Sequence, residues 1–181
     1  MSSSTASSID RINGVPVRQC LDLVEAVRKD PANGQTQWRS TTTWKGGFSC
    51  ESRIRSHQLH LDEPEVLGGS DAAPNPVEAV LAAYGSCLAI GYTLNAAVRG
   101  IEVRSLSVDV EGHIDLAGFF GISSEVPAGF SGISTKVHLD ADATPEQLDA
   151  LHRHVLATSP VGSILERPLE VHTELVLPAR A

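Results

Sequence analysis

The sequence is poor in aromatic residues and in positive charge, and both shortages limit the kind of partner it can have. Its 181 residues include two Trp, two Tyr and four Phe, which is 4% of the chain. Proteins that hold single-stranded nucleic acid stack the bases on exposed aromatic rings, and this composition argues against such a platform. The net charge is −8, from 14 Lys and Arg against 22 Asp and Glu, and it repels a phosphate backbone. We therefore expect no nucleic-acid partner.

Cysteines are also few, and they are widely spaced. Cys20, Cys50 and Cys87 lie 30 and 37 residues apart, so the chain has no pair of cysteines with two residues between them. This spacing excludes a zinc ribbon and a thioredoxin-type dithiol. The seven histidines show no spacing typical of metal ligands. We therefore predict no metal and no cofactor.

The odd, sparse cysteine count is unlike that of a disulfide-stapled secreted domain. Residues 1–8 are rich in Ser and lack the basic and apolar regions of a signal peptide. We therefore expect a reducing, cytoplasmic location. There, an isolated cysteine is either a small buried apolar residue or a reactive thiol.

One long uncharged run is present. The twenty residues from Ala79 to Val98 carry no charge, and twenty is the length that spans a bilayer. The run also contains two Tyr, two Gly, Ser, Thr and Asn, which make it less apolar than a Leu-rich span. We therefore interpret it as a fully buried helix of a soluble protein and expect no membrane association.

The pattern along the chain predicts the α+β class, with one central apolar helix. We expect residues 1–13 to form a flexible tail and residues 14–181 to form a single domain. Spacing and capping signals predict helices over residues 17–30, 76–99, 145–158 and 160–165. Alternation predicts strands over residues 38–44, 48–61, 101–115, 133–139 and 169–177, with a bulge near Arg104-Ser105. Residues 62–76 and 116–130 are expected to be loops.

Small residues form one continuous face of the central helix. Spacing alone favours equally a second helix, such as that of a symmetry mate, and a sheet as the partner of this face. Cys87 lies in the middle of the helix. Glu78 lies nine residues earlier, about 180° around the helix, so it cannot face Cys87 along one straight helix and suits the first turn instead.

A basic segment, Arg53-Ile54-Arg55-Ser56-His57, offers the positive charge that a reactive thiol needs. If it is one strand, Arg53, Arg55 and His57 share a face. The alternative for each of them is a solvated strand face. His152 and His154 fall on an amphipathic helix and are interpreted as solvated.

Several short motifs follow one another in a fixed order along the chain. They are Asp62-Glu63-Pro64, Gly68-Gly69, Pro74-Asn75-Pro76-Val77-Glu78, Ala82-Ala83-Tyr84-Gly85-Ser86-Cys87-Leu88, Ala97-Val98-Arg99-Gly100-Ile101, Glu111-Gly112-His113-Ile114-Asp115, Gly118-Phe119-Phe120-Gly121 and Thr158-Ser159-Pro160-Val161. This ordered set, over roughly residues 38–177, resembles the OsmC/Ohr family of osmotically inducible and organic hydroperoxide resistance proteins, and it is more specific than any single motif.

The resemblance implies an OsmC-like fold, an intertwined homodimer with long central cysteine-bearing helices flanked by β-sheets. It implies active sites at the dimer interface. In peroxidase members the helix cysteine attacks the hydroperoxide O–O bond, giving alcohol and a sulfenic acid. An Arg favours the thiolate, a Glu orients that Arg, and a second cysteine resolves the sulfenate as a disulfide. Cys87 matches the attacking position.

Three positions depart from the pattern of the peroxidase members. The resolving cysteine precedes a proline in a late helix, where this chain has Ser159, and serine cannot form a disulfide. The hydroperoxide resistance subgroup places its Glu at the position of Val77, whereas Glu78 follows the broader OsmC-like pattern. The Arg after the paired glycines is replaced by Phe48, which leaves Arg55 or Arg53 to act instead.

The leading hypothesis is a thiol peroxidase that reduces organic hydroperoxides in oxidative-stress defence. Its catalytic residues are Cys87, Arg55 and Glu78, and an external thiol resolves the oxidised cysteine. Cys50 is a conceivable internal resolver, and Cys20 is interpreted as helix packing. The alternative is a non-catalytic homodimer of the same fold that binds a small apolar ligand at the subunit interface. A purely structural dimer is the third possibility.

Overall fold

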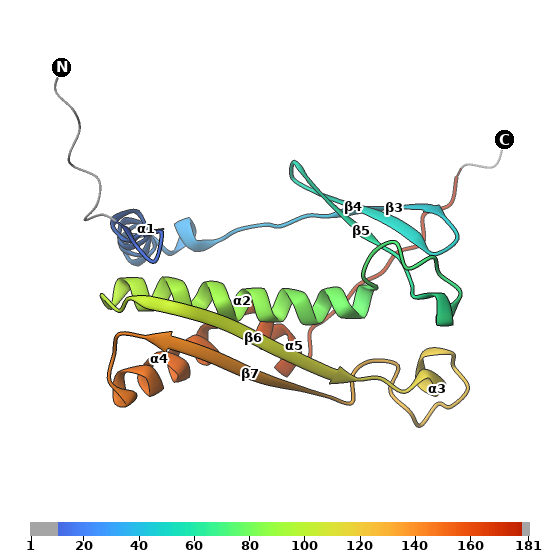
Figure 1. Ribbon diagram of the computed structural model, residues 1–181. Coiled ribbons are helices and arrows are strands. Elements are labelled where there is room, and N and C mark those ends of the chain that lie inside the picture. Colours follow the sequence, from blue (N-terminus) through green and yellow to red (C-terminus); the bar gives the residue numbers. More distant parts are fainter. Residues whose placement is uncertain (1–10, 179–181) are drawn as a thin grey trace, which may run out of the picture.

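The computed structural model describes residues 11–178 and confirms the α+β class (Figure 1). Its strands are β1 (Arg11–Ile12), β2 (Val15–Pro16), β3 (Thr41–Gly46), β4 (Ser49–Ile54), β5 (His57–Leu61), β6 (Val103–His113) and β7 (Gly132–Ala141). Its α-helices are α1 (Val17–Lys29), α2 (Pro76–Val98), α3 (Leu116–Phe119), α4 (Pro145–Thr158) and α5 (Pro160–Glu166). Two single-turn 3-10 helices cover Pro31–Gly34 and Glu65–Leu67.

The long helix α2 runs through the middle of the molecule (Figure 1). On one side lie the antiparallel pair β6–β7 and the helices α4 and α5, and all but β7 contact α2 extensively. On the other side lie α1 and the antiparallel sheet β3–β4–β5. The fully packed core is therefore one-sided. Its buried members are Leu88, Tyr92, Ala96, Ile101, Ala141, Leu151 and Val155.

Helix α2 starts and stops where its sequence predicts. Asn75 accepts a hydrogen bond from the Glu78 N–H through Oδ1 (2.8 Å), and the Glu78 carboxylate accepts one from the Asn75 N–H (2.8 Å). This capping box satisfies two amide groups that the first turn would leave without partners. Pro76 occupies N1, where its missing N–H costs nothing. After the helix, Gly100 adopts a φ of 73°, which favours glycine.

The expectation that α2 is fully buried is wrong within one chain. Only Leu88, Tyr92, Ala96 and Ala97 of its 23 residues are buried, and Ile90 is 66% exposed. The reason is geometric, because β6, α4 and α5 cover only one side of the helix. By length and apolar composition α2 also qualifies as a membrane-spanning helix.

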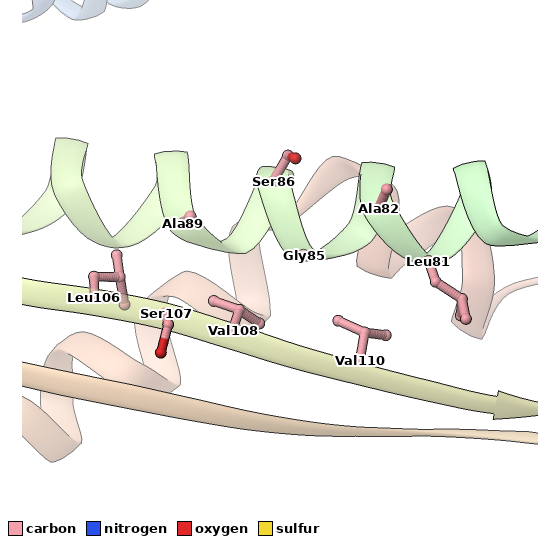
Figure 2. Close-up of a pocket in the computed structure, with 9 residues that line it drawn as sticks. All are labelled: Leu81, Ala82, Gly85, Ser86, Ala89, Leu106, Ser107, Val108 and Val110. Atoms are coloured by element: carbon pink, nitrogen blue, oxygen red, sulfur yellow. The ribbon is translucent and has the colours of Figure 1, made fainter. Parts of the chain in front are cut away.

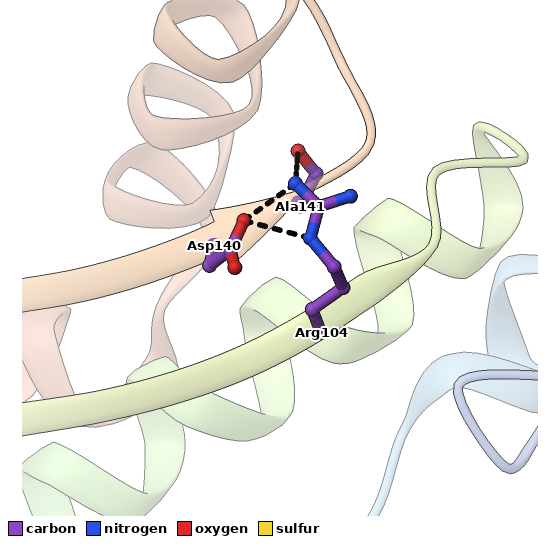
Figure 3. Close-up of polar contacts among 3 residues, drawn as sticks. All are labelled: Arg104, Asp140 and Ala141. Atoms are coloured by element: carbon purple, nitrogen blue, oxygen red, sulfur yellow. Dashed lines mark hydrogen bonds and ion pairs between the residues drawn. The ribbon is translucent and has the colours of Figure 1, made fainter.

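The bulge predicted in the strand after α2 is present. The register of β6 against β7 shifts between Val103 and Ser105, which leaves Arg104 as the extra residue. The Arg104 guanidinium donates to the Asp140 carboxylate through Nε (2.9 Å) and Nη2 (2.5 Å), and to the Ala141 carbonyl (3.1 Å; Figure 3). The hydrogen bond that Arg104 donates, together with its positive charge, holds the pKa of Asp140 below its usual value. The bulge is thus braced against the neighbouring strand.

The loop before α2 is ordered by one carboxylate. Asp62 is 3% exposed and accepts hydrogen bonds from the Ser70 hydroxyl (2.5 Å), the Ser70 N–H (3.0 Å) and the Ala72 N–H (3.2 Å). The Ser70 hydroxyl is the main reason that the pKa of Asp62 falls to about 2, and backbone N–H donors add to it. Gly69 packs so closely that an added Cβ would lie 1.8 Å from the Glu63 carbonyl oxygen.

Three segments differ from the sequence expectations. The predicted tail, residues 1–13, is ordered at its end, since β1 pairs with β2 and Asn13 bonds the Ile101 carbonyl and the Val103 N–H. Residues 1–10 of that prediction lie outside the described residues. The strand expected over residues 48–61 is a hairpin, β4–β5, with a turn at residues 55–56. The loop at 116–130 contains the short helix α3.

The strand expected over residues 169–177 is not formed within the described chain. The alternating side chains that predicted it are exposed, with Val171 at 79% and Leu175 at 82%. A strand needs a neighbour for its backbone hydrogen bonds, and no described strand of this chain pairs with the segment.

Candidate functional site

Cys87 lies on the side of α2 that faces α4 and α5. There it lines a cavity of about 600 Å³, whose walls are largely apolar. Helix α2 supplies Ala83, Ser86, Cys87, Ile90, Gly91, Leu94 and Asn95 to this cavity, and residues 154–160 supply His154, Val155, Thr158, Ser159 and Pro160. Cavities of this size and lining are typical of small-molecule sites. The geometry thus places the predicted nucleophile in a largely apolar cavity that is partly open to solvent.

Ser159 contacts the Cys87 thiol directly. The Cys87 Sγ and Ser159 Oγ atoms are 3.4 Å apart, and Ser159 is 5% exposed. Ser159 holds this place because it caps α5, where its hydroxyl oxygen accepts a hydrogen bond from the Gly162 N–H (3.1 Å). The position matched to the resolving cysteine of the peroxidase members therefore does meet Cys87 in space.

His154 reaches the same cavity, although its sequence context suggested only a solvated histidine. Cys87 and His154 are the only titratable side chains among the described residues that line the cavity. The sequence spacing carries a signal for this placement, since His154 lies one helical turn before Thr158 and therefore on the same side of α4. His152 points elsewhere and bonds the Tyr92 hydroxyl, with the two rings stacked at 6.2 Å.

Glu78 does not reach the cavity within one chain. Its carboxylate is engaged in the capping box at the start of α2, as its alternative interpretation predicts, and its side chain is exposed.

Arg55 does not line the Cys87 cavity within one chain either; it lies at the exposed tip of the β4–β5 hairpin with a φ of 56°. The prediction that Arg53, Arg55 and His57 share one strand face is wrong. The turn reverses the chain after Ile54, which pairs with His57, so Arg53 and His57 fall on opposite faces.

The other two cysteines lie outside the cavity. Cys50 is in β4, where it pairs with Trp44 on one side and Leu61 on the other, and Cys20 is in α1. All three thiols are free and partly buried. The residues that the structure describes include no cluster of His, Cys, Asp or Glu able to hold a metal ion.

A second, shallower groove of about 410 Å³ runs between α2 and β6 (Figure 2). Its floor contains Gly85, where an added Cβ would lie 3.3 Å from the Val110 side chain. Ala82 and Ser86 border the groove and point away from β6 (Figure 2). The small-residue face therefore packs partly on a sheet, which was one of the two expected partners, and partly remains open.

Tyr84 lies one helical turn before Cys87 on α2 and lines a separate pocket with Thr135. Burial raises the pKa of Tyr84, with smaller contributions from Glu166 and Cys87. Tyr84 therefore stays neutral across the physiological pH range and does not supply a second anion beside Cys87.

Known proteins share this fold and the segment that carries the site. The model of the family of OsmC-like proteins matches residues 68–174, which include α2, Cys87 and Ser159. No curated protein sequence matches the chain.

Solved structures agree with the family match at the level of the fold. An OsmC-like protein from Mycoplasma pneumoniae is 16% identical, with a TM-score of 0.63 over 73% of this chain and 89% of its own. An organic hydroperoxide resistance protein from Legionella pneumophila is 19% identical, with a TM-score of 0.54 over 72% and 91%. An OsmC-like protein of unknown function from Vibrio cholerae is 16% identical, with a TM-score of 0.55 over 71% and 93%. The α+β chain described above, with its cysteine on a long central helix, belongs to the OsmC-like protein family.

Proposed function

We propose that this protein is a thiol peroxidase that reduces organic hydroperoxides through Cys87. The observation that carries the proposal is the position of the Cys87 thiol in a largely apolar cavity of about 600 Å³, in contact with Ser159. An apolar cavity suits the hydrocarbon part of an organic hydroperoxide and disfavours hydrogen peroxide. The hydroperoxide resistance protein with the same fold supports this direction.

The chemistry uses one cysteine. The Cys87 thiolate attacks the terminal peroxide oxygen, the O–O bond breaks, and the alkoxide leaves and takes a proton from solvent. Cys87 is then a sulfenic acid. Because Ser159 cannot resolve it, an external thiol attacks the sulfenic sulfur, which releases water and forms a mixed disulfide. A second external thiol attacks that bond, restores the Cys87 thiol and leaves as the disulfide of the reductant.

The test is chemical trapping of the intermediate. The protein is treated with one equivalent of cumene hydroperoxide and dimedone, and the labelled residue is located by mass spectrometry. We expect label on Cys87, loss of label in Cys87→Ser, and unchanged label in Cys50→Ser. Labelling of Cys87 no faster than that of Cys20 would sink the proposal.

The active unit in this proposal is a homodimer. The chain exposes 13948 Å² of surface, whereas a compact globular chain of 19.2 kDa exposes about 8,400 Å². A third of the difference between these two surface areas already exceeds the roughly 800 Å² that a standard interface buries on each partner. The open face of α2 and the exposed alternating segment 169–177 are the surfaces we assign to the second copy. Sedimentation velocity measures the state, and a monomer at micromolar concentration would contradict this assignment.

A homodimer also gives Arg55 and Glu78 a route to the site. Within one chain neither residue reaches Cys87, so in this proposal they act on the Cys87 of the other copy, across the interface. We propose Arg55 as the cation that favours the thiolate of the other copy. Arg55→Ala should then slow oxidation of Cys87, while Arg53→Ala serves as the matched control. Equal rates in both variants would remove Arg55 from the mechanism.

The second candidate function is non-catalytic binding of an apolar ligand. It is favoured by one observation, namely that the described residues lining the cavity include neither Arg nor Lys, and no second thiol. Native mass spectrometry of the purified protein would then show a bound ligand, and Cys87→Ser would bind it equally well. Absence of bound ligand together with sulfenic acid on Cys87 would reject this alternative.

A further inference from the structure

We propose that Ser159 is a positioning residue whose hydroxyl donates a hydrogen bond to the Cys87 thiolate and, after oxidation, to the sulfenate. This inference rests on the proposed function and adds to it a residue that acts through the reacting sulfur. Its basis is the contact of 3.4 Å between Ser159 Oγ and Cys87 Sγ, together with the partner on the other side of the hydroxyl.

The second partner fixes the direction of the hydrogen bond. A serine hydroxyl has one hydrogen to donate and two lone pairs that accept. The Gly162 N–H can only donate, and its bond to Ser159 Oγ (3.1 Å) takes one lone pair. The hydroxyl hydrogen is therefore free for an acceptor, and Cys87 Sγ is the acceptor within reach. A thiolate has no hydrogen of its own, so the bond runs from oxygen to sulfur.

Burial makes this bond matter. Ser159 is 5% exposed, so little water is at hand to replace its hydroxyl as the donor. A hydrogen bond to a charged acceptor is stronger than one between neutral groups, and more so where the surroundings are apolar. The Gly162 amide polarises the hydroxyl from the other side, which strengthens the donor further. Ser159 thus favours the charged form of Cys87.

The expected gain in rate is modest and has a definite pH dependence. A tenfold larger thiolate fraction at neutral pH costs roughly threefold in nucleophilicity, since the Brønsted slope is about 0.4–0.5. The net gain is then about threefold for each tenfold in thiolate. Above the pH at which the thiol is fully ionised in both proteins, the variant and the wild type have the same thiolate fraction. The variant without the hydroxyl should there react as fast as the wild type or faster.

Three other titratable groups lie on the elements around the thiol. His154 of α4 lines the Cys87 cavity, whereas Tyr84, one turn before Cys87 on α2, and Glu166, the last residue of α5, line a separate pocket. Tyr84 is neutral below about pH 10, because its pKa is raised by burial. Among the described residues that line the Cys87 cavity, His154 is the one other titratable side chain, so each profile is repeated in a His154→Gln background.

The experiment compares three substitutions at Ser159 in the full-length protein, with Cys20→Ser and Cys50→Ser so that Cys87 alone reports. Ser159→Thr keeps both the helix cap and the donor. Ser159→Asp keeps a strong cap but, as a carboxylate, has no hydrogen and adds like charge. Ser159→Ala removes both, and Ser159→Gly, which caps better than Ala, replaces it if the alanine variant unfolds.

Two rates are measured from pH 5 to 9.5, namely alkylation of Cys87 by iodoacetamide and its oxidation by cumene hydroperoxide. We expect Ser159→Ala to be about threefold slower at pH 7 and no slower at pH 9.5. Ser159→Asp should be slower than Ser159→Ala at pH 7, and Ser159→Thr should stay close to the wild type. A purely structural role predicts equal slowing at every pH, and that result, or no slowing at pH 7, overturns the inference.

The two proposals fail separately. If cumene hydroperoxide leaves wild-type Cys87 unoxidised, the peroxidase proposal fails while the alkylation profiles still test Ser159. If the wild type is oxidised and the alkylation profiles of the alanine variant and the wild type coincide, the Ser159 proposal fails and the peroxidase proposal stands.

Discussion

Replacing Ser159 with cysteine should convert the site into one that closes an internal disulfide. In the wild type, Ser159 Oγ lies 3.4 Å from Cys87 Sγ, and a disulfide requires about 2.05 Å between two sulfurs. The longer carbon–sulfur bond of a cysteine at 159 supplies part of the difference, and small side-chain rotations supply the rest. Peroxide oxidation of Ser159→Cys should therefore yield a bond between positions 87 and 159 instead of a lasting sulfenic acid.

The bond would also raise stability. It joins residues 72 positions apart, and the chain-entropy model gives about 4 kcal/mol for a loop of this length as an upper figure. For a chain of this size, that corresponds to a rise in Tm of roughly 8–16 °C. Engineered disulfides often deliver less than the entropic figure. The direction of the shift, and its loss under dithiothreitol, are the firm expectations.

The assay combines intact mass and trapping. One equivalent of cumene hydroperoxide should remove two hydrogen atoms from Ser159→Cys, abolish dimedone labelling of Cys87 and raise Tm. Ser163→Cys is the matched control, since Ser163 lies on the same helix but does not line the Cys87 cavity. Persistent dimedone labelling in Ser159→Cys, at the wild-type level, would refute the geometric reasoning.

Three further predictions concern the fold and its partner. Because the pKa of Asp62 falls from 3.8 to about 2 on folding, its stabilising contribution is complete above about pH 4 and is lost as the pH drops towards 2; Asp62→Asn should flatten thermal stability across that window, and a parallel curve would contradict this. Gly69→Ala should cost about 3 kcal/mol or more in urea unfolding, since its Cβ meets backbone, whereas Gly129→Ala, with open space around it, should be near neutral; equal costs would be the contrary result. Charged substitutions at Val171 and Leu175 should weaken self-association measured by sedimentation. An unchanged dimer would show that segment 169–177 is not part of the interface.

Local signals predicted most of the elements. The capping box formed by Thr144 and Gln147 fixes the start of α4, and Asn75 with Glu78 does the same for α2. The bulge at Arg104 was visible as a change in the parity of apolar residues. These features depend on interactions between residues a few positions apart, and such interactions can be predicted from the sequence.

The predictions that failed share a cause. Each of these features depends on residues that are distant in the sequence or on a second chain. The turn at Arg55 carries no glycine and places arginine at a φ of 56°, so alternation alone extended one strand across it. Segment 169–177 alternates over most of its length, yet it has no described partner strand in its own chain. The approach of Ser159 and His154 to Cys87 depends on how α4 and α5 dock on α2, which residue spacing does not encode.

The cap of α5 links fraying of this helix to the surroundings of the Cys87 sulfur. The same Ser159 hydroxyl accepts from the Gly162 amide and touches Cys87, so the helix end and the sulfur share one atom. Each time the first turn of α5 opens, the thiol loses its partner and the Gly162 amide becomes free to exchange with solvent. Hydrogen exchange at the Gly162 amide therefore measures how often the Cys87 sulfur loses its contact with Ser159.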